Sequence, residues 1–425
     1  MCARARACVC VHYGPLRRVI THTPAHPHTH TRTHTHTHTH THALSRCSKG
    51  ASTVHNVAPN GFAAIKMTAL GPPKLLERMS TAIVQVKSLF HKMDKNGQGV
   101  LTTAEFSNGY REYFHTSNPV TGDGDTHALW SLDSLLEQLD PEDTGQIELS
   151  EWTQLLQLEH LPALTSRCRN QGPLSSAVLT DAEIAAAKSM TSRIEHLTSL
   201  ASQLDVRLMI DAEQTYFQPA IDNTVLALQE RHNRGNKFTV FNTYQCYLKG
   251  ADARLQNDQR RAMRRGYNFA AKVVRGAYMV SERERAADMG YPSPVHDTLE
   301  DTHACYHRAI DHCLDSMGSG SPTELMVASH NQQSVEHTLA RLEELRLAPD
   351  CGVYFGQLLG MSDHLTYLLG ENKYQAYKYV PYGAVNEVMP YLLRRAQENS
   401  ALLGSVASET RMLKEEIGRR MAGAS

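Results

Sequence analysis

The sequence predicts an α/β protein built on a (β/α)8 barrel of the TIM type, with a small all-α unit inserted into it. Three observations lead to this prediction. Short apolar runs alternate with amphipathic stretches over residues 206–382, which is the pattern of parallel strands covered by helices. Two loops with calcium-ligand spacing lie within residues 94–151. Polar side chains recur where the predicted strands end, at the face on which barrels carry their active sites.

Length and charge limit the class of protein. The 425 residues would fill one barrel of about 250 residues and a smaller module. The 43 basic and 44 acidic side chains leave a net charge of -1, so no overall field draws the chain to nucleic acid or to anionic lipid. No window of 18 consecutive apolar residues predicts a membrane-spanning helix. A small or neutral partner fits best, and we expect no nucleic acid ligand.

The leader, residues 1–55, is predicted to be disordered. Nine of the 24 histidines lie between His22 and His42, mostly alternating with Thr. Neutral imidazoles can bind metals, but a polar tract without apolar residues does not fold, and a repeated CA dinucleotide encodes the same alternation. The absence of Asp and Glu before Glu77 would also suit a transit peptide. Our hypothesis is that translated repeat DNA stands here in place of the original N-terminus.

The first predicted barrel strand lies within residues 60–71. It is a short apolar run from Phe62 to Leu70, interrupted by Lys66 and closed by the sequence GPP. Such a run bounded by glycine and proline is typical of a buried strand. Lys66 would therefore stand near the end of that strand.

Residues 78–165 contain two helix-loop-helix patterns of the EF-hand type. Each loop has oxygen-bearing side chains at the ligand positions and glycine at the sixth position, where the backbone turns sharply. The alternative is a pair that keeps its fold without an ion, because Gln98 and Thr144 are neutral where carboxylates would strengthen binding. The candidate calcium ligands are Asp94, Asn96, Gln98, Thr102 and Glu105 in the first loop and, as the weaker set, Asp140, Glu142, Thr144, Glu148 and Glu151 in the second.

Residues 175–405 are predicted to form the rest of the barrel, and residues 406–425 a C-terminal tail. With the strand that carries Lys66 the predicted strands number seven, whereas a (β/α)8 barrel needs eight. We therefore expect a barrel that lacks its first strand, with unpaired edges. The six further strands span residues 206–212, 237–245, 270–278, 324–329, 351–359 and 376–382.

Polar residues at the strand ends are the candidates for an active site. Each alone could be a salt-bridge or helix-cap residue, but their number at one end of the barrel favours a site. The last helix adds Tyr391, Arg394 and Arg395, and adjacent arginines suit bidentate binding of a carboxylate. The strand-end candidates are Lys66, Asp211, Gln245, Lys272, Arg275, Tyr278, His330, Gln357 and Tyr379.

These motifs resemble the proline dehydrogenase family. The likeness runs from about Gly61 to Asn399, and eukaryotic members of the family carry a similar calcium-loop insertion. The resemblance implies a mitochondrial flavoenzyme, associated with the matrix side of the inner membrane, that begins proline breakdown. The motifs are IKMTALG, RLMIDAEQTYFQPAI, VFNTYQCYLK, KVVRGAYM, VASHN, VYFGQLLGM and YKYVPYG followed by PYLLRRAQEN.

The resemblance also implies roles for individual residues. Lys66, Arg394 and Arg395 would surround the substrate carboxylate, and charge-assisted hydrogen bonds of this kind contribute roughly 1.5 to 3 kcal/mol each. Asp211 would be the active-site aspartate, with Tyr278, Tyr379 and Tyr391 lining the substrate pocket. The residues expected around FAD are Gln245, Lys272, Arg275, Gly276, Ala277, His330, Asn331 and Glu398.

The reaction implied is hydride transfer from C5 of L-proline to the flavin N5, with ubiquinone as the final electron acceptor. The product would be 1-pyrroline-5-carboxylate, on the route to glutamate. Two alternatives stay open. The sister family that oxidises hydroxyproline has serine where this chain has Tyr379, so the tyrosine favours proline. An inactive, calcium-binding relative with an incomplete barrel is the other.

Overall fold

A computed structural model provides the structure of the chain. It describes residues 7–12, 36–57, 61–115, 131–156 and 158–382, together with short pieces between residues 389 and 422. Residues 13–35, which include the first part of the His/Thr tract, and most of the segment from residue 383 onward lie outside the described residues.

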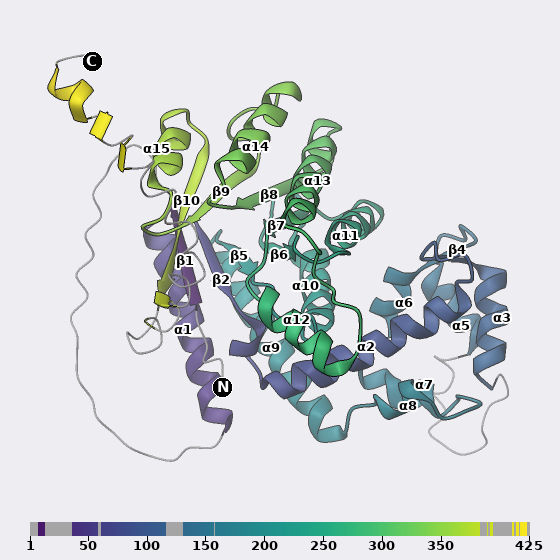
Figure 1. Cartoon of the computed structure of the whole chain (residues 1–425). Coiled ribbons are helices and arrows are strands. Elements are labelled where there is room, and N and C mark those ends of the chain that lie inside the picture. The colour runs from purple at the N-terminus through teal and green to yellow at the C-terminus, as the bar shows by residue number, and fades with distance from the viewer. Residues whose placement is uncertain are drawn as a thin grey trace.

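Seven parallel strands form a curled sheet, each paired with the next along the chain (Figure 1). The α/β class and all seven predicted strands are thereby confirmed. The strands are β2 (Phe62–Ile65), β5 (Arg207–Ile210), β6 (Val240–Gln245), β7 (Phe269–Val274), β8 (Thr323–Ala328), β9 (Val353–Leu358) and β10 (Gln375–Tyr382).

The leader contributes two elements where the sequence predicts none. Strand β1 (Ala7–His12) pairs antiparallel with both β2 and β10, so the ring of strands closes. The unpaired backbone groups of two parallel edge strands are satisfied in this way. Helix α1 (His36–Val57) buries Cys47 and Val54 in the same core as β2 and β5, and Ala51 is buried as well, so its second half has the apolar face that the His/Thr repeat lacks.

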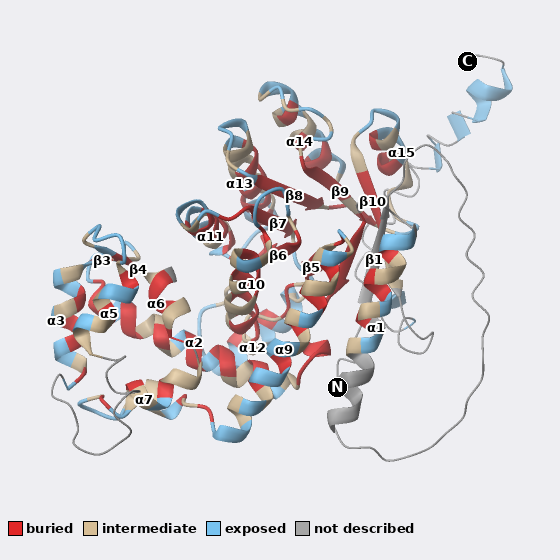
Figure 2. Ribbon diagram, turned by 180° about the vertical axis from the view of Figure 1, so that it is seen from behind, coloured by how far each residue is buried: buried red, intermediate tan, exposed pale blue. Residues whose placement is uncertain are grey.

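Helices cover the outside of the sheet, and the strands are the most deeply buried elements (Figures 1 and 2). Helix α9 begins with a capping box between Thr180 and Glu183, and α11 ends at Gly266, which adopts φ 63°. The covering helices are α9 (Asp181–Gln203), α10 (Gln218–His232), α11 (Ala251–Arg265), α12 (Met279–Met289), α13 (Leu299–Gly318), α14 (Gln332–Glu344) and α15 (Asp363–Glu371).

Aromatic and small apolar side chains fill the inside of the sheet. The ring of Phe62 meets those of Phe241, Tyr354 and Tyr377 edge-on, with centroids 5.0 to 5.3 Å apart. Edge-to-face pairs of this kind add to the burial of apolar area. The interior is therefore a packed core, and any ligand must bind at one of its two ends. The inner cluster consists of Phe62, Ala64, Met209, Phe241, Ala270, Met326, Tyr354 and Tyr377.

The insertion after β2 has a core of its own, which includes Phe90, Phe106, Ile147 and Trp152. Its two short strands pair antiparallel, and the Trp152 indole donates to the Val86 carbonyl over 3.0 Å. The insertion lies at one side of the barrel (Figure 1). Its elements, with the short helices on either side, are η1 (Met67–Ala69), α2 (Pro73–Met93), β3 (Val100–Thr102), α3 (Thr103–Tyr113), α5 (Leu132–Leu139), β4 (Gln146–Glu148), α6 (Leu149–Leu155), η2 (Leu158–His160), α7 (Leu161–Thr165) and α8 (Pro173–Ser176).

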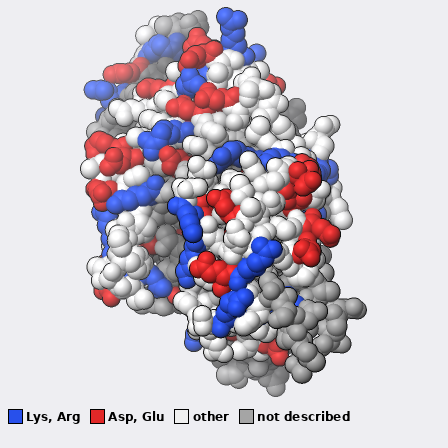
Figure 3. All heavy atoms as spheres, turned by 90° about the vertical axis from the view of Figure 1, so that its right-hand side faces the viewer, with Lys and Arg blue, Asp and Glu red and all other residues white. Residues whose placement is uncertain are grey.

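Charged side chains of both signs alternate over the face that includes the insertion (Figure 3). This face therefore presents no extended patch of one charge. None of the helices in the described part of the chain is long and apolar enough to cross a membrane.

Candidate active site

Alternation along the strands brings six of the predicted residues to one end of the barrel interior. Side chains two residues apart on a strand point to the same face. The inner-core residues Ala64, Met209, Ala270 and Tyr377 are each followed two positions later by a polar residue. The inner-core residues Phe241 and Met326 are each followed four positions later by a polar residue. The polar residues selected in this way are Lys66, Asp211, Gln245, Lys272, His330 and Tyr379.

Asp211 is the centre of this arrangement and directly follows β5. Its Oδ1 accepts a hydrogen bond from the Lys272 ammonium at 2.7 Å, and its Oδ2 accepts one from the Tyr379 hydroxyl at 2.9 Å. The side chains of Asp211 and Lys272 are only 14% and 9% exposed. Strands β5, β7 and β10 are thus joined through one carboxylate.

The charge of Asp211 is set by its neighbours. Burial raises the pKa of the carboxyl group, but the ammonium groups of Lys272 and Lys66 and the hydroxyl of Tyr379 outweigh burial and leave the pKa below its ordinary value. The carboxylate is therefore ionised at neutral pH. It can accept hydrogen bonds or stabilise a cation, but it has no proton to donate.

Lys66 follows β2 and reaches toward the start of α12. Its ammonium donates to the Tyr278 hydroxyl over 2.7 Å and lies 5.4 Å from the centroid of that ring. Burial disfavours the charge of Lys66, but Tyr278, Glu213 and Asp211 outweigh it and raise the pKa of the ammonium. Lys66 thus stays protonated and suits the binding of an anion.

Two residues that the sequence analysis missed support this part of the site. The Glu213 carboxylate accepts hydrogen bonds from the main-chain N–H and the hydroxyl of Thr68. The main-chain carbonyl of Glu213 accepts a hydrogen bond from the Gln245 side chain at 2.7 Å. The available signal was the acidic residue two positions after Asp211, which alternation places on the same side of the chain.

Arg275 lies apart from the Asp211 cluster. Its guanidinium donates to His303, Ser329 and Ser334 at 2.6 to 2.9 Å and packs over the ring of Tyr306. These contacts hold it against α13 and the beginning of α14. No contact among the described residues joins it to Asp211.

His330 and Asn331 are placed at the start of α14. Asn331 caps this helix, because its Oδ1 accepts from the Ser334 N–H at 2.9 Å. The His330 Nε2 accepts from the Leu358 N–H at 2.9 Å, and burial and then the charge of Lys378 lower the pKa of His330 to about 4. His330 is therefore neutral at physiological pH.

Gly276 and Ala277 lie between Arg275, which is apart from the Asp211 cluster, and Tyr278, which contacts Lys66. Gly276 adopts φ 133°, and a Cβ atom there would lie 1.5 Å from the Tyr247 ring. Only glycine fits this turn, which sends Arg275 to the outside of the sheet and Tyr278 to the mouth. Ala277 is exposed at the rim. Gln357, by contrast, faces α15, where its Oε1 accepts from Thr366.

Four predicted residues, which are Tyr391, Arg394, Arg395 and Glu398, lie outside the described residues. Their roles around the substrate and FAD stay predictions.

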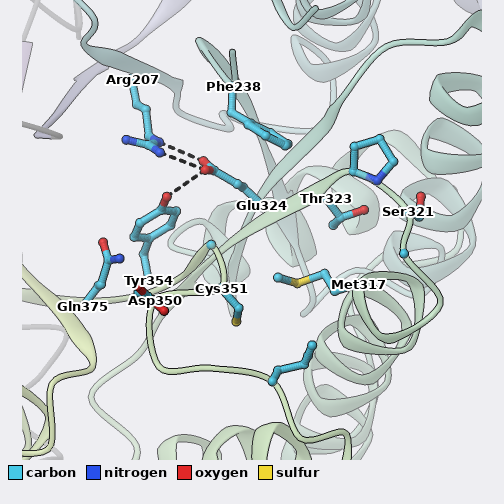
Figure 4. A pocket seen from close by; sticks show the side chains of 14 residues that line it. Arg207, Phe238, Met317, Ser321, Thr323, Glu324, Asp350, Cys351, Tyr354 and Gln375 are labelled. Carbon is cyan, nitrogen blue, oxygen red and sulfur yellow. Dashed lines mark hydrogen bonds and ion pairs between the residues drawn. The ribbon is translucent and has the colours of Figure 1, made fainter. Parts of the chain in front are cut away.

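A cavity of about 430 Å³ opens at the opposite end of the barrel (Figure 4). There the Arg207 guanidinium binds both oxygens of Glu324 at 2.8 Å, and the Tyr354 hydroxyl donates to the same carboxylate. The charged groups are paired with one another, and in barrels of this type active sites lie at the opposite, C-terminal face. The end with Asp211 is therefore the better candidate site.

The chain is similar to known proteins over most of its length. Residues 75–408 match the family described as Proline dehydrogenase. The chain is 40% identical over 378 residues to proline dehydrogenase 1, mitochondrial, of Homo sapiens, covering 86% of this chain and 61% of that protein. It is 38% identical over 374 residues to the protein of the same name in Drosophila melanogaster, covering 85% and 53%.

A hydroxyproline dehydrogenase of Bos taurus is 38% identical over 310 residues, covering 68% of this chain and 67% of that protein. Percent identity alone therefore does not separate the two substrates. The chain spans 53 to 61% of the length of the two proline dehydrogenases.

The buried pair between Asp211 and Lys272 gives a stability prediction. Lys272→Met should lower the free energy of unfolding by about 3 kcal/mol, because it leaves a buried carboxylate without its closest cation. Adding Asp211→Asn should recover part of that loss. Chemical denaturation of the single and double variants measures both effects.

The matched control is Lys249→Met, which removes an exposed ion pair with Asp297 and should cost no more than about 0.5 kcal/mol. Equal stability of the Lys272→Met variant and the double variant would contradict the prediction.

Proposed function

The chain belongs to the proline dehydrogenase family, and we propose on this premise that it oxidises L-proline to 1-pyrroline-5-carboxylate with bound FAD. This is the first step of proline catabolism to glutamate, and it would make the protein an oxidoreductase acting on a CH–NH group. The observation that carries the proposal is the buried cluster of Asp211, Lys272 and Tyr379 beside Lys66 at the barrel mouth.

The substrate would be bound by charge at one end and by shape at the other. Lys66 is held protonated and has donors for a carboxylate, to which Arg394 and Arg395 would add. The Tyr278 hydroxyl accepts a hydrogen bond from Lys66 and the Tyr379 hydroxyl donates one to Asp211, so each ring is fixed through its hydroxyl. Fixed rings and a fixed cation orient a small cyclic amino acid, which lowers the entropy cost of reaching the reactive geometry.

The residues around the mouth fit an anionic dinucleotide. Arg275 lies beside the beginning of α14, whose main-chain N–H groups suit a phosphate, and Lys272 and Gln245 face the inside of the mouth. FAD bound there would supply the hydride acceptor for C5 of proline. The residues that would hold it are Gln245, Lys272, Arg275, Gly276, Ala277, His330, Asn331 and Glu398.

Lys272 would have two functions. Its ammonium already neutralises Asp211, and the same cation can stabilise negative charge that gathers on a bound cofactor. Asp211 in turn holds Tyr379 in place through its second oxygen. The cluster thus links the pocket for the substrate with the pocket for the cofactor.

The setting of the reaction follows from the relatives. The proline dehydrogenases that the chain resembles are named mitochondrial. We infer the same compartment, with ubiquinone as electron acceptor and peripheral association with the inner membrane on its matrix side.

The direct test is an assay of the purified full chain. The protein should be yellow, L-proline should bleach it, and a soluble quinone analogue should be reduced in a proline-dependent way. Asp211→Asn should lower kcat/KM about 100-fold, because the cluster that orients the substrate pocket loses its centre. A colourless protein, or a yellow one that proline does not bleach, would favour the inactive relative instead.

Tyr379 gives a prediction about substrate choice. Tyr379→Ser should raise the ratio of kcat/KM for trans-4-hydroxyproline to that for proline at least about tenfold, because the ring that would crowd a 4-hydroxyl is removed. Tyr379→Phe is the control, since it removes the hydroxyl that bonds Asp211 and keeps the ring. A wild-type protein that prefers trans-4-hydroxyproline would instead support the hydroxyproline alternative.

Calcium at the first loop of the insertion is a further part of the proposal. Asp94 accepts hydrogen bonds from the main-chain N–H groups of Gln98 and Gly99, and Gly99 adopts φ 73°, as an EF-hand loop requires. Within the described part of the chain no three His, Cys, Asp or Glu side chains are arranged to hold a metal ion. Glu105, now bonded to Thr102 but exposed, would have to turn inward.

The second loop fits a cation less well. Asp140 again accepts from the backbone of its loop, but Glu148 is bound to Arg264 and Glu151 to Arg265 on α11. These are the ninth and twelfth loop positions, where an ion would need them. The two glutamates instead attach the insertion to the barrel.

This difference gives a prediction for metal titration. The full chain should bind one Ca²⁺ by calorimetry, and Arg264→Ala with Arg265→Ala should add a second, weaker site, because Glu148 and Glu151 are released. Glu105→Gln should remove the first site and serves as its control. Two sites in the unaltered chain, or none, would contradict the assignment.

A further inference from the structure

The Glu213 carboxylate at the barrel mouth binds one residue with both of its oxygens. Both oxygens accept hydrogen bonds from one residue, Thr68, whose main-chain N–H lies at 3.0 Å and whose hydroxyl lies at 2.7 Å. The two residues are only 3% and 6% exposed. Paired bonds to a buried carboxylate fix the orientation of the group that donates them.

Thr68 belongs to the turn that presents Lys66. Lys66 is the residue before η1, and its carbonyl accepts the N–H of Ala69 at 3.0 Å. Thr68 is the central residue of η1, so a carboxylate that fixes Thr68 also fixes the backbone from which Lys66 projects. The position of the Lys66 ammonium at the mouth thus depends on Glu213.

The main chain of Glu213 is itself held from two other elements. Its N–H donates to the Gln218 side chain on α10 at 2.9 Å, and its carbonyl accepts from the Gln245 side chain on β6 at 2.7 Å. Gln218 and Gln245 are both buried. Glu213 is therefore fixed in place. Its carboxylate in turn fixes Thr68, and its main-chain carbonyl fixes the side chain of Gln245.

We propose that Glu213 is a positioning residue, which fixes the anion-binding Lys66 through Thr68 and aligns it with Gln245 on the cofactor side. The inference rests on the proposed function, because it assigns Lys66 to the substrate carboxylate and Gln245 to the cofactor. The hydrogen-bonded clamp between Glu213 and Thr68 sets the geometry of the Lys66 turn whichever substrate binds there. Asp211 fixes the inside of the pocket, and Glu213 fixes its rim.

The chain offers variants that separate the clamp from the charge. Glu213→Gln keeps the size of the side chain, and its amide can accept from the Thr68 N–H and donate to the Thr68 hydroxyl. Glu213→Ala removes the clamp and leaves the main-chain bonds to Gln218 and Gln245 in place. Thr68→Val removes one of the two bonds from the other side.

The expected result in the full holoenzyme is a split between kinetic constants. Glu213→Ala should raise KM for proline about tenfold while kcat changes less than about threefold, because it loosens the group that binds the carboxylate. Thr68→Val should raise KM by a smaller factor, and Glu213→Gln should restore values within about twofold of the unaltered protein.

A control variant and a second measurement make the test specific. Asn233→Ala removes buried hydrogen bonds to Val240 and Asn268 at the other end of β6, so it should lower stability and leave KM unchanged. Amide hydrogen exchange over residues 66–70 should accelerate in Glu213→Ala and Thr68→Val and stay slow in Asn233→Ala. This measurement reports on the clamp whether or not proline is the substrate.

Unchanged exchange over residues 66–70 in the soluble Glu213→Ala and Thr68→Val proteins would overturn the clamp. A Glu213→Gln protein as impaired as Glu213→Ala would overturn it as well, because charge would then be the cause. If the unaltered protein does not oxidise proline but the exchange results hold, the proposed function fails while the clamp stands.

Discussion

The site depends on the compensation of one buried carboxylate. Asp211 is ionised in a mouth that is largely shielded from water, and an unpaired charge there would destabilise the fold by several kcal/mol. Its two partners come from β7 and β10, and Lys66 adds its charge from β2. These strands are separated along the sequence and meet only because the sheet curls into a ring. Closure of the sheet and stability of the site are therefore one requirement, and the antiparallel β1 serves both by pairing with β2 and β10.

Alternation along the strands explains why much of this arrangement was predictable from sequence. Apolar runs bounded by glycine and polar residues indicated the seven parallel strands, and all seven are present. Lys66, Asp211 and Lys272 stand in register with inner-core residues two positions earlier, so local sequence already placed them on one face at one end. The sequence alone does not predict which hydrogen-bond partners each strand-end side chain has. Arg275 also follows a strand, but the glycine turn after it directs its guanidinium outward to Ser329 and Ser334.

Two features that the sequence did not reveal depend on long-range contacts. Thr68 and Glu213 are 145 positions apart, and Glu151 and Arg265 are 114 positions apart. Neither pair leaves a periodic signal, because each consists of one polar residue on each of two elements. The prediction for the leader differs from the structure for another reason. Composition indicated disorder across residues 1–55, yet the second half of α1 contains enough buried apolar residues, such as Cys47 and Val54, to pack against the barrel. The His/Thr repeat in the first half of α1 therefore masked the apolar face of its second half in the composition.

The two ends of the barrel show how the same chemistry serves stability in one place and binding in another. At the N-terminal end, the Arg207 guanidinium donates to both oxygens of Glu324 through Nε and Nη2, and the Tyr354 hydroxyl donates to the same carboxylate (Figure 4). At the C-terminal end, Lys66 has three N–H donors, and within the described part of the chain its one hydrogen bond goes to the Tyr278 hydroxyl. Its nearest carboxylates are already engaged, Asp211 with Lys272 and Glu213 with Thr68. The N-terminal end is thus compensated by an ion pair of its own, whereas at the C-terminal end the Lys66 ammonium forms no ion pair with a carboxylate in the described part of the chain.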